Sequence, residues 1–351
     1  MKSLIYLHSS NIDFRPESFR DYYKTVYGLG PCPVDRFGLL PLIDPDPIEF
    51  TNIVPEPVYN LNNLTNDWRD RYFSIFPEVA DNVYKKLGNR DLVLLYSGGI
   101  DSAAVLVALM KHPQYKDILD EGRFKIAMST TSIQEYPEMF YELILPKIPI
   151  IVADYNRIMN DPNMFVVTGD AGDYVIGNTD TPIFHYDGST DNLHADKSAL
   201  WPYLNTVDRT GKFTDFLMSL ARHAPFDIIS VNQMYWWLGQ AFVHQGEMCY
   251  PYTWSTTTDL SELASFNKIF RFFLDDKFNT FSFEYMSTNP YYTNYNSVRQ
   301  WPREYIVDYT GHASYLNKIK VFSQQLLYKR RYKTRIYKDL SCTNEYGRIE
   351  S

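Results

Sequence analysis

The chain has 351 residues, a formal net charge of −8 and 45% hydrophobic residues, which is typical of a globular protein with a sizeable core. The negative charge disfavours broad, non-specific binding to nucleic acid. Its three cysteines show no zinc-site spacing, and no apolar stretch reaches the length of a signal peptide or a membrane-spanning helix. We therefore expect a cytoplasmic protein that does not associate with membranes.

The first 62 residues differ in composition from the rest. A short strand is predicted over Ser3–Leu7, and seven prolines follow between Pro31 and Pro57. Proline lacks a backbone donor and blocks helix interiors, so we expect an irregular segment at 1–62. Aromatic residues make up 16% of the chain, with 29 tyrosines, and we assign them to irregular loops packed by aromatic rings.

From residue 63 onward, strands alternate with helices. A helix is predicted from the capping residues Thr65–Asp67 to Gly88, with Pro77 kinking or splitting it. Strand, helix, strand, helix and two further strands then follow, which predicts an α/β fold with a doubly wound parallel sheet. In order, these elements are Leu92–Leu95, Ala103–Met110, Phe124–Met128, Tyr136–Leu145, Ile148–Ala153 and Met164–Thr168.

After Gly177 the pattern is mainly helical. One loop, rich in Tyr and Asn, is predicted over Asn289–Trp301. The predicted helices of this C-terminal part are Lys212–His223, Val231–His244, Thr258–Phe273 and Ser314–Tyr328.

The most informative stretch is Ser97-Gly98-Gly99-Ile100-Asp101-Ser102, between the first strand of the sheet and its helix. Glycines allow a tight turn whose N–H groups approach a ligand closely. Together with two hydroxyls and the positive end of a helix, they form a cradle for an anion. No Lys follows the glycines, so this is not a Walker loop. The alternative is a glycine-rich strand-to-helix turn without a ligand.

A second glycine-bearing stretch, Gly169-Asp170-Ala171-Gly172-Asp173, follows the strand that ends at Thr168. Ligands bind at the carboxyl ends of parallel strands, so we expect this stretch and Ser97 on one edge of the sheet. Either Asp170 or Asp173 then completes a Mg²⁺ site with Asp101, since Mg²⁺ in ATP sites takes one or two carboxylates plus phosphate oxygens. The alternative is a capped turn before a helix.

The first stretch resembles the signature of the PP-loop (N-type) ATP pyrophosphatases, which cleave ATP between the α- and β-phosphates. The second is similar to the Gly-Glu-Gly-Ala-Asp-Glu-Leu-Phe-Gly-Gly pattern of asparagine synthetases and β-lactam synthetases, with Gly177 on the first closing Gly. Two weaker similarities to these synthetases follow, at 246–252 with 260–263 and at 301–306.

This resemblance implies an adenine nucleotide α-hydrolase-like domain over 63–351, with ATP and Mg²⁺ as cofactors. It places Ser97, Gly98, Gly99 and Ser102 on the pyrophosphate, and Asp101 and Asp173 on the metal. Gly169 and Asp170 belong to the same nucleotide site. The backbone near Leu95 and Met128 flanks the adenosine.

Several positions depart from the synthetase pattern. Tyr174 stands where the family has a Glu beside the reacting carboxyl group. Asp308 and Thr310 stand where it has Arg-x-Lys, so Lys318 and Lys320 are the nearest replacement cations for the leaving pyrophosphate; otherwise both lie on a solvated helix face. Only about 60 residues precede the first long predicted helix, so we expect no glutaminase domain of the family's kind. The amine is then expected from free ammonia, another protein or the substrate.

The leading hypothesis is an ATP-dependent, AMP-forming C–N ligase that adenylates a small substrate of amino-acid or nucleobase type. A second is a PP-loop enzyme that modifies tRNA or a nucleobase. It rests on the basic, Tyr-containing stretch Tyr328–Lys338, which otherwise reads as a solvated helix. A third is a catalytically reduced ATP-binding interaction protein, favoured by Tyr174. The sequence leaves the oligomeric state open.

Overall fold

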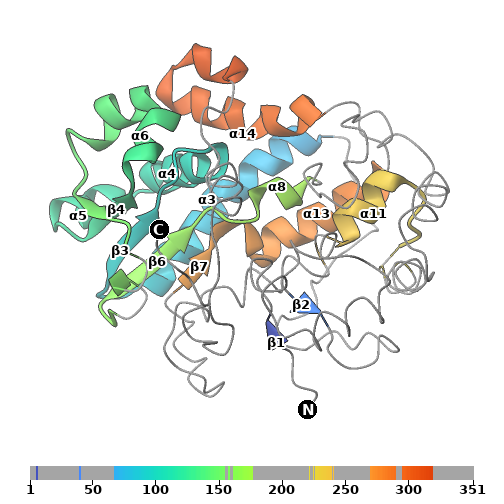
Figure 1. Cartoon of the computed structure of the whole chain (residues 1–351), viewed down its shortest axis with the longest axis horizontal. Coiled ribbons are helices and arrows are strands. Elements are labelled where there is room, and N and C mark those ends of the chain that lie inside the picture. Colours follow the sequence, from blue (N-terminus) through green and yellow to red (C-terminus); the bar gives the residue numbers. More distant parts are fainter. Residues whose placement is uncertain are drawn as a thin grey trace, which may run out of the picture.

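The computed structural model of the chain (Figure 1) describes residues 67–154, 157–158, 161–176, 226–238, 269–289 and 295–318, with positions 5–6, 39–40, 221, 224 and 240. Within these residues, the fold is a five-stranded, all-parallel sheet flanked by helices. This confirms the predicted doubly wound α/β architecture. No described helix combines the length and apolarity that crossing a bilayer requires.

The strand order of the sheet is β5-β4-β3-β6-β7. The chain therefore builds outward from β3 to β4 and β5, and then crosses back to place β6 on the other side of β3. The first four strands agree with their predicted positions. The bounds are β3 (Asp91–Leu95), β4 (Phe124–Met128), β5 (Ile150–Val152), β6 (Met164–Thr168) and β7 (Ile269–Arg271).

Successive side chains of β3 point to opposite faces of the sheet, and both faces are buried. Leu92 and Leu94 face the large core formed with the helices, whereas Val93 faces a smaller apolar cluster with Val166 and Ile158. Each of these side chains is at most 1% exposed. A parallel strand buried on both faces needs this continuous apolar run, which is why β3 and β6 were predictable.

Two long helices cover the larger core. Helix α3 (Trp68–Leu87) begins after Asp67, ends at Gly88 and runs unbroken through Pro77. Helix α4 (Ile100–Lys111) follows β3 directly and packs against α3. A short helix, α5 (Tyr115–Asp120), leads from α4 into β4. The predictions for α3 and α4 are confirmed, without the break at Pro77.

The structure differs from the predicted helices in two regions. The end of the predicted helix Thr258–Phe273 is the edge strand β7, continued by the 3₁₀ turn η8 (Phe272–Leu274). Pairing with β6 satisfies its backbone, and a short apolar run fits either a buried strand or a buried helix by pattern alone. The following helix α13 (Asp276–Thr288) was not predicted, although Asp275 caps it by accepting from the Lys277 N–H at 3.1 Å.

The predicted loop Asn289–Trp301 is also wrong in its second half, because α14 (Tyr295–Thr310) begins there. Packing of α14 on α4 and α3 outweighs the loop-like composition. Conversely, the predicted helix Ser314–Tyr328 begins as the 3₁₀ turn η9 (Ala313–Asn317), and Lys318 after it is extended.

Smaller elements complete the described fold. The predicted helix Tyr136–Leu145 contains the π-helical segment η1 (Met139–Ile144), preceded by an unpredicted helix α6 (Thr130–Glu135). The predicted helix at 231–244 begins as α11 (Val231–Leu238). Strands β1 (Ile5–Tyr6) and β2 (Leu39–Leu40) pair antiparallel, and the rest of segment 1–62 lies outside the described residues, as does 212–223 apart from Ala221.

Many aromatic side chains of the described residues lie between helices. Tyr72 and Phe76 of α3 contact the rings of Phe278 and Phe281 of α13, and Phe76 stacks on Tyr305 of α14 with 4.1 Å between the ring centres. In this part of the chain the rings join α3, α13 and α14 to one another.

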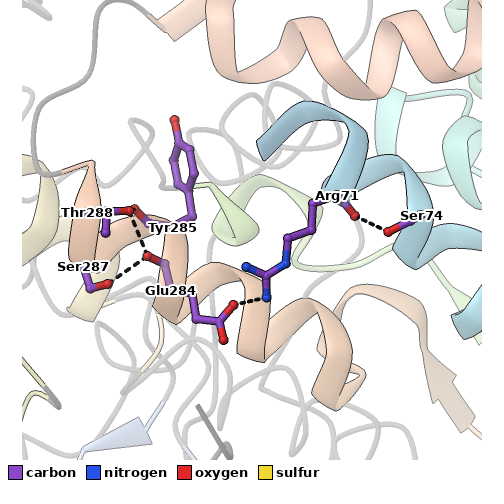
Figure 2. Close-up of polar contacts among 6 residues, drawn as sticks. All are labelled: Arg71, Ser74, Glu284, Tyr285, Ser287 and Thr288. Carbon is purple, nitrogen blue, oxygen red and sulfur yellow. Dashed lines mark hydrogen bonds and ion pairs between the residues drawn. The ribbon is translucent and has the colours of Figure 1, made fainter. Parts of the chain in front are cut away.

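An ion pair reinforces the aromatic layer between α3 and α13. Figure 2 shows Arg71 of α3 reaching Glu284 of α13, whose side chain is 5% exposed. The Arg71 guanidinium also lies 5.5 Å from the Trp68 ring centre. Because a buried carboxylate without a partner is costly, this ion pair helps to fix how α3 and α13 pack against each other.

Candidate functional site

The two glycine-bearing loops meet at the point where the strand order reverses. β3 and β6 are neighbours, and Leu95 pairs with Thr168 at their carboxyl ends. A Cβ added to Gly169 would lie 2.8 Å from the Ser102 nitrogen, and one added to Gly172 would lie 2.5 Å from Asp101 Oδ1. The loops are therefore in direct contact. Open α/β sheets bind ligands in this kind of crevice.

The first loop, Ser97–Ser102, is organised by its own hydroxyls. Ser102 Oγ accepts from the Ser97 N–H at 3.2 Å and lies 3.1 Å from Ser97 Oγ. The Gly99 N–H donates to Ser97 Oγ at 3.3 Å. Ser102 is buried and Ser97 is exposed, so the loop presents one hydroxyl to solvent at the N-terminus of α4. This arrangement suits an anion.

Gly98 is fixed by close contact with helix α6. Its φ of 77° lies in the left-handed region, and a Cβ there would run into the Ser132 carbonyl oxygen and lie 2.8 Å from Glu135 Cβ. Both neighbours belong to α6, which follows β4. Only glycine satisfies both the backbone angle and the close approach, so the first loop is held between α6 and the second loop.

The second loop is more exposed and more charged. Ala171 adopts a φ of 68°, which is unusual for a residue with a side chain, and Asp170 is exposed. Asp173, in the short helix α8 (Gly172–Val175), pairs with Arg299 of α14 at 3.1 Å. Arg299 belongs to no motif in the sequence and was not predicted. In the sequence it is distinguished only as a positively charged residue two positions before Trp301.

The Asp101 and Asp173 carboxylates lie close enough to influence the same buried group. Tyr72 of α3 is 1% exposed, and its pKa is raised well above its usual value, first by burial and then by the charges of Asp101 and Asp173. Both carboxylates that the sequence singled out for a metal thus act on this hydroxyl, and Asp101 also lies against Gly172, the residue before Asp173.

The donor set fits Mg²⁺ on a polyphosphate better than a protein-only metal site. Within the described part of the chain, no three His, Cys, Asp or Glu side chains converge to hold a metal ion. Two carboxylates with phosphate oxygens are what Mg²⁺ uses beside ATP. Thr168 Oγ1, buried where β6 ends, has no hydrogen-bond partner among the described residues, which also favours a polar ligand at this edge.

The two positions expected beside the adenosine end adjacent strands. Leu95 is the last residue of β3 and is partly buried, whereas Met128 is the last of β4 and is buried. Ala127, before Met128, is the register partner of Leu95. Both backbones are therefore at the same edge as the first loop.

Lys318 does not lie on a solvated helix face. Its ammonium group is 5.0 Å from the Tyr136 ring centre and 5.3 Å from that of Tyr315, and it has no hydrogen-bond partner among the described residues. Burial lowers the Lys318 pKa.

Two neighbouring charged residues act on Lys318. Arg303 holds the backbone in place by donating to the Lys318 carbonyl oxygen at 2.9 Å. Glu135, which abuts Gly98, is the leading charge that opposes the shift.

The position that counting assigns to the family's basic pair carries no cation toward the site. Asp308 is exposed and pairs with Lys111 at 3.4 Å, and Thr310 lies in the last turn of α14. Several predictions fall outside the described residues and remain predictions: Gly177, Lys320, residues 246–252 and 260–263, and the basic stretch 328–338.

Comparison of the chain with protein-family models, with curated proteins and with solved structures yields no match. The geometry of this sheet edge and the residues that form it are therefore the basis for the function proposed below.

Proposed function

We propose that the chain is an ATP-dependent, AMP-forming C–N ligase with an adenine nucleotide α-hydrolase-like domain of the PP-loop type. The observation that carries this proposal is the contact between the two loops, where the Asp101 carboxylate lies against Gly172, the residue before Asp173. A glycine turn, two hydroxyls, a helix N-terminus and two carboxylates at one switch point match the needs of Mg²⁺-bound triphosphate.

In the proposed reaction, a carboxylate or amide oxygen of the substrate attacks the α-phosphate of ATP. The bond between the α-phosphorus and its bridging oxygen breaks, pyrophosphate leaves, and an amine or ammonia then displaces AMP. Ser97, Gly98, Gly99 and Ser102 hold the pyrophosphate, while Asp101 and Asp173 hold Mg²⁺. Catalysis consists of positioning and charge neutralisation, because the leaving group carries several negative charges.

Other residues take supporting roles in this proposal. The backbones at Leu95 and Met128 flank the adenosine, and Gly169 and Asp170 complete the phosphate edge. Lys318 contributes positive potential from the Gly98 side, and Lys320, which lies outside the described residues, stays a second candidate cation. The substrate is a small molecule of amino-acid or nucleobase type.

Binding tests the nucleotide site without knowledge of the substrate. We expect calorimetry to detect α,β-methylene-ATP, which has no cleavable oxygen bridge between the α- and β-phosphates, only when Mg²⁺ is present. Asp101→Ala should abolish this binding. Asp308→Ala, which removes an exposed carboxylate of α14, is the matched control and should leave it unchanged.

Turnover tests the reaction. Incubation with Mg·ATP and a panel of amino acids should yield AMP and pyrophosphate, and Asp101→Ala should reduce the rate at least about 100-fold. Release of ADP would contradict the mechanism. Thermal unfolding of each variant separates loss of function from loss of fold.

A second candidate is an ATP-binding protein without turnover. It is favoured by Tyr174, which replaces the carboxylate that asparagine synthetases place at the reacting group, and whose carbonyl oxygen accepts from Gln240 Nε2 at 3.4 Å. Binding of the methylene analogue, with no AMP formed across a broad set of metabolites, would support this candidate over the ligase.

A further inference from the structure

Arg299 joins α14 to the second loop at the edge where the two loops meet. Its guanidinium Nη2 lies 3.1 Å from Asp173 Oδ1, and the two side chains are 12% and 35% exposed. Arg299 is thus withdrawn from solvent more than its partner. The pair lies beside Gly172, whose Cα carries no side chain and is approached closely by Asp101 Oδ1.

Carboxylates from both loops act at this edge. Asp101 and Asp173 both act on the buried Tyr72 hydroxyl, so two carboxylates share this region with the Arg299 guanidinium. A polyphosphate is repelled by such a cluster until a metal ion adds positive charge. Arg299 in turn neutralises a carboxylate that a metal ion would bind. A metal ion bound at Asp173 would therefore compete with the guanidinium.

We propose that Arg299 is the cation that binds the leaving pyrophosphate, and that Mg²⁺ frees it by taking Asp173. This inference rests on the proposed function and names its leaving-group residue. The guanidinium fork matches phosphate oxygens in a bidentate manner, whereas Mg²⁺ prefers carboxylate oxygen. The exchange of partners changes no covalent bond: Asp173 passes from Arg299 to the metal, and Arg299 passes to the phosphate.

Two observations favour Arg299 over the positions that the family pattern indicates. Asp308 carries negative charge and pairs with Lys111, and Thr310 carries none. Lys318 lies over two tyrosine rings on the Gly98 side of the first loop. Arg299 already contacts the carboxylate that would hold the metal, so a phosphate bound with that metal would lie within reach of its guanidinium.

The experiment compares Arg299→Ala and Arg299→Lys with Lys111→Ala. Lys111→Ala is the matched control, because it also removes an ion pair of α14 but at the exposed Asp308. Calorimetry measures the binding of inorganic pyrophosphate with Mg²⁺. Electron paramagnetic resonance measures the binding of Mn²⁺ alone. Urea unfolding measures the stability of each variant.

Arg299→Ala should weaken Mg²⁺–pyrophosphate binding at least about tenfold, while it tightens the binding of Mn²⁺ alone, because Asp173 is no longer paired. Arg299→Lys should retain part of the pyrophosphate affinity, and Lys111→Ala should match the wild type in both measurements. Opposite shifts for metal and pyrophosphate are the signature of competition, which a purely structural ion pair does not produce.

Three results overturn the proposal. If the wild type binds Mg²⁺–α,β-methylene-ATP but Arg299→Ala keeps full affinity for pyrophosphate, the role of Arg299 is wrong and the proposed function stands. If metal and pyrophosphate affinities fall together with stability in both Arg299 variants, the pair is structural. If the wild type binds neither nucleotide nor pyrophosphate, the proposed function fails and this inference fails with it.

Discussion

The two loops of the site are held in place in different ways. Ser97–Ser102 is fixed mainly by its own hydroxyls and by contact with α6, and it contains one carboxylate. Gly169–Asp173 is short and charged, contains a left-handed Ala171, and depends on an arginine from a distant helix. The conformation of the first loop thus depends mainly on hydrogen bonds between its own residues. The second loop depends on an ion pair with a residue far away in the sequence.

The largest expected effect is at Gly98, where the first loop meets α6. Gly98→Ala should lower the free energy of unfolding by about 3 kcal/mol, since the left-handed angle and the clash with Ser132 add up. Gly122→Ala is the matched control, because its φ is 72° with nothing within 4 Å of an added Cβ. That control should cost only about 1 kcal/mol in urea unfolding. Equal losses would show that the α6 contact is not rigid.

Gly172→Ala tests the contact between the loops. Its added Cβ would lie 2.5 Å from Asp101 Oδ1 and 2.6 Å from Asp101 Cγ, so the carboxylate has to move. We expect a loss of about 1 to 2 kcal/mol in stability, and a loss of Mg²⁺-dependent nucleotide binding of at least about tenfold. Unchanged binding would mean that Asp101 does not need its present position.

Lys318→Met separates stability from function beside the first loop. The free energy of unfolding at neutral pH should stay within about 1 kcal/mol of the wild type, because the charged amine is buried without a hydrogen bond. Nucleotide binding should weaken. A fall in stability beyond that range would indicate that the tyrosine rings stabilise the cation more than burial penalises it.

The same burial gives Lys318 a pH dependence of known sign. Its pKa is below the ordinary 10.5 in the folded chain, so the unfolded chain binds more protons between the two values. Wild-type stability should therefore rise, relative to Lys318→Met, as the pH passes from the folded pKa to 10.5. Urea unfolding across that alkaline range measures the difference, and a relative fall would contradict the assignment.

Ala171→Gly should have the smallest effect. Glycine relieves the strain of a φ of 68° in the second loop, and its greater freedom in the unfolded chain offsets part of that gain. We expect a change in stability between zero and about +1 kcal/mol. Retained nucleotide affinity in this variant would indicate that the strain serves no binding function.

Local patterns were sufficient for the elements closest to the site. The buried run Leu92–Leu94 predicted β3, the apolar Ala103–Met110 predicted α4, and Asp67 and Gly88 bounded α3. Such elements can be predicted because burial on both faces of a strand, or the preferences of the positions at helix ends, restrict the residue types allowed. The placement of Ser97 and Gly169 at one edge followed from parallel topology.

The errors arose where packing between distant segments decides the structure. The run Ile269–Arg271 is a strand because β6 offers it a ladder, and Tyr295–Trp301 is helical because α14 packs on α3 and α4. Neither neighbour is visible in a local window. Some aromatic contacts are hidden from a local window for the same reason, as in Tyr72 with Phe278, which lies 206 positions further along the chain.

What the sequence alone determined is the first loop: its glycines, its hydroxyls and its place between a buried strand and an apolar helix. Only the tertiary structure decided that Asp101 lies against Gly172, that Arg299 pairs with Asp173, and that Lys318 lies over tyrosine rings. The physical reason is the separation along the chain over which each kind of interaction acts. Turn and helix preferences act over a few residues, whereas charge pairing and close packing depend on which distant segments the folded chain brings within a few ångströms.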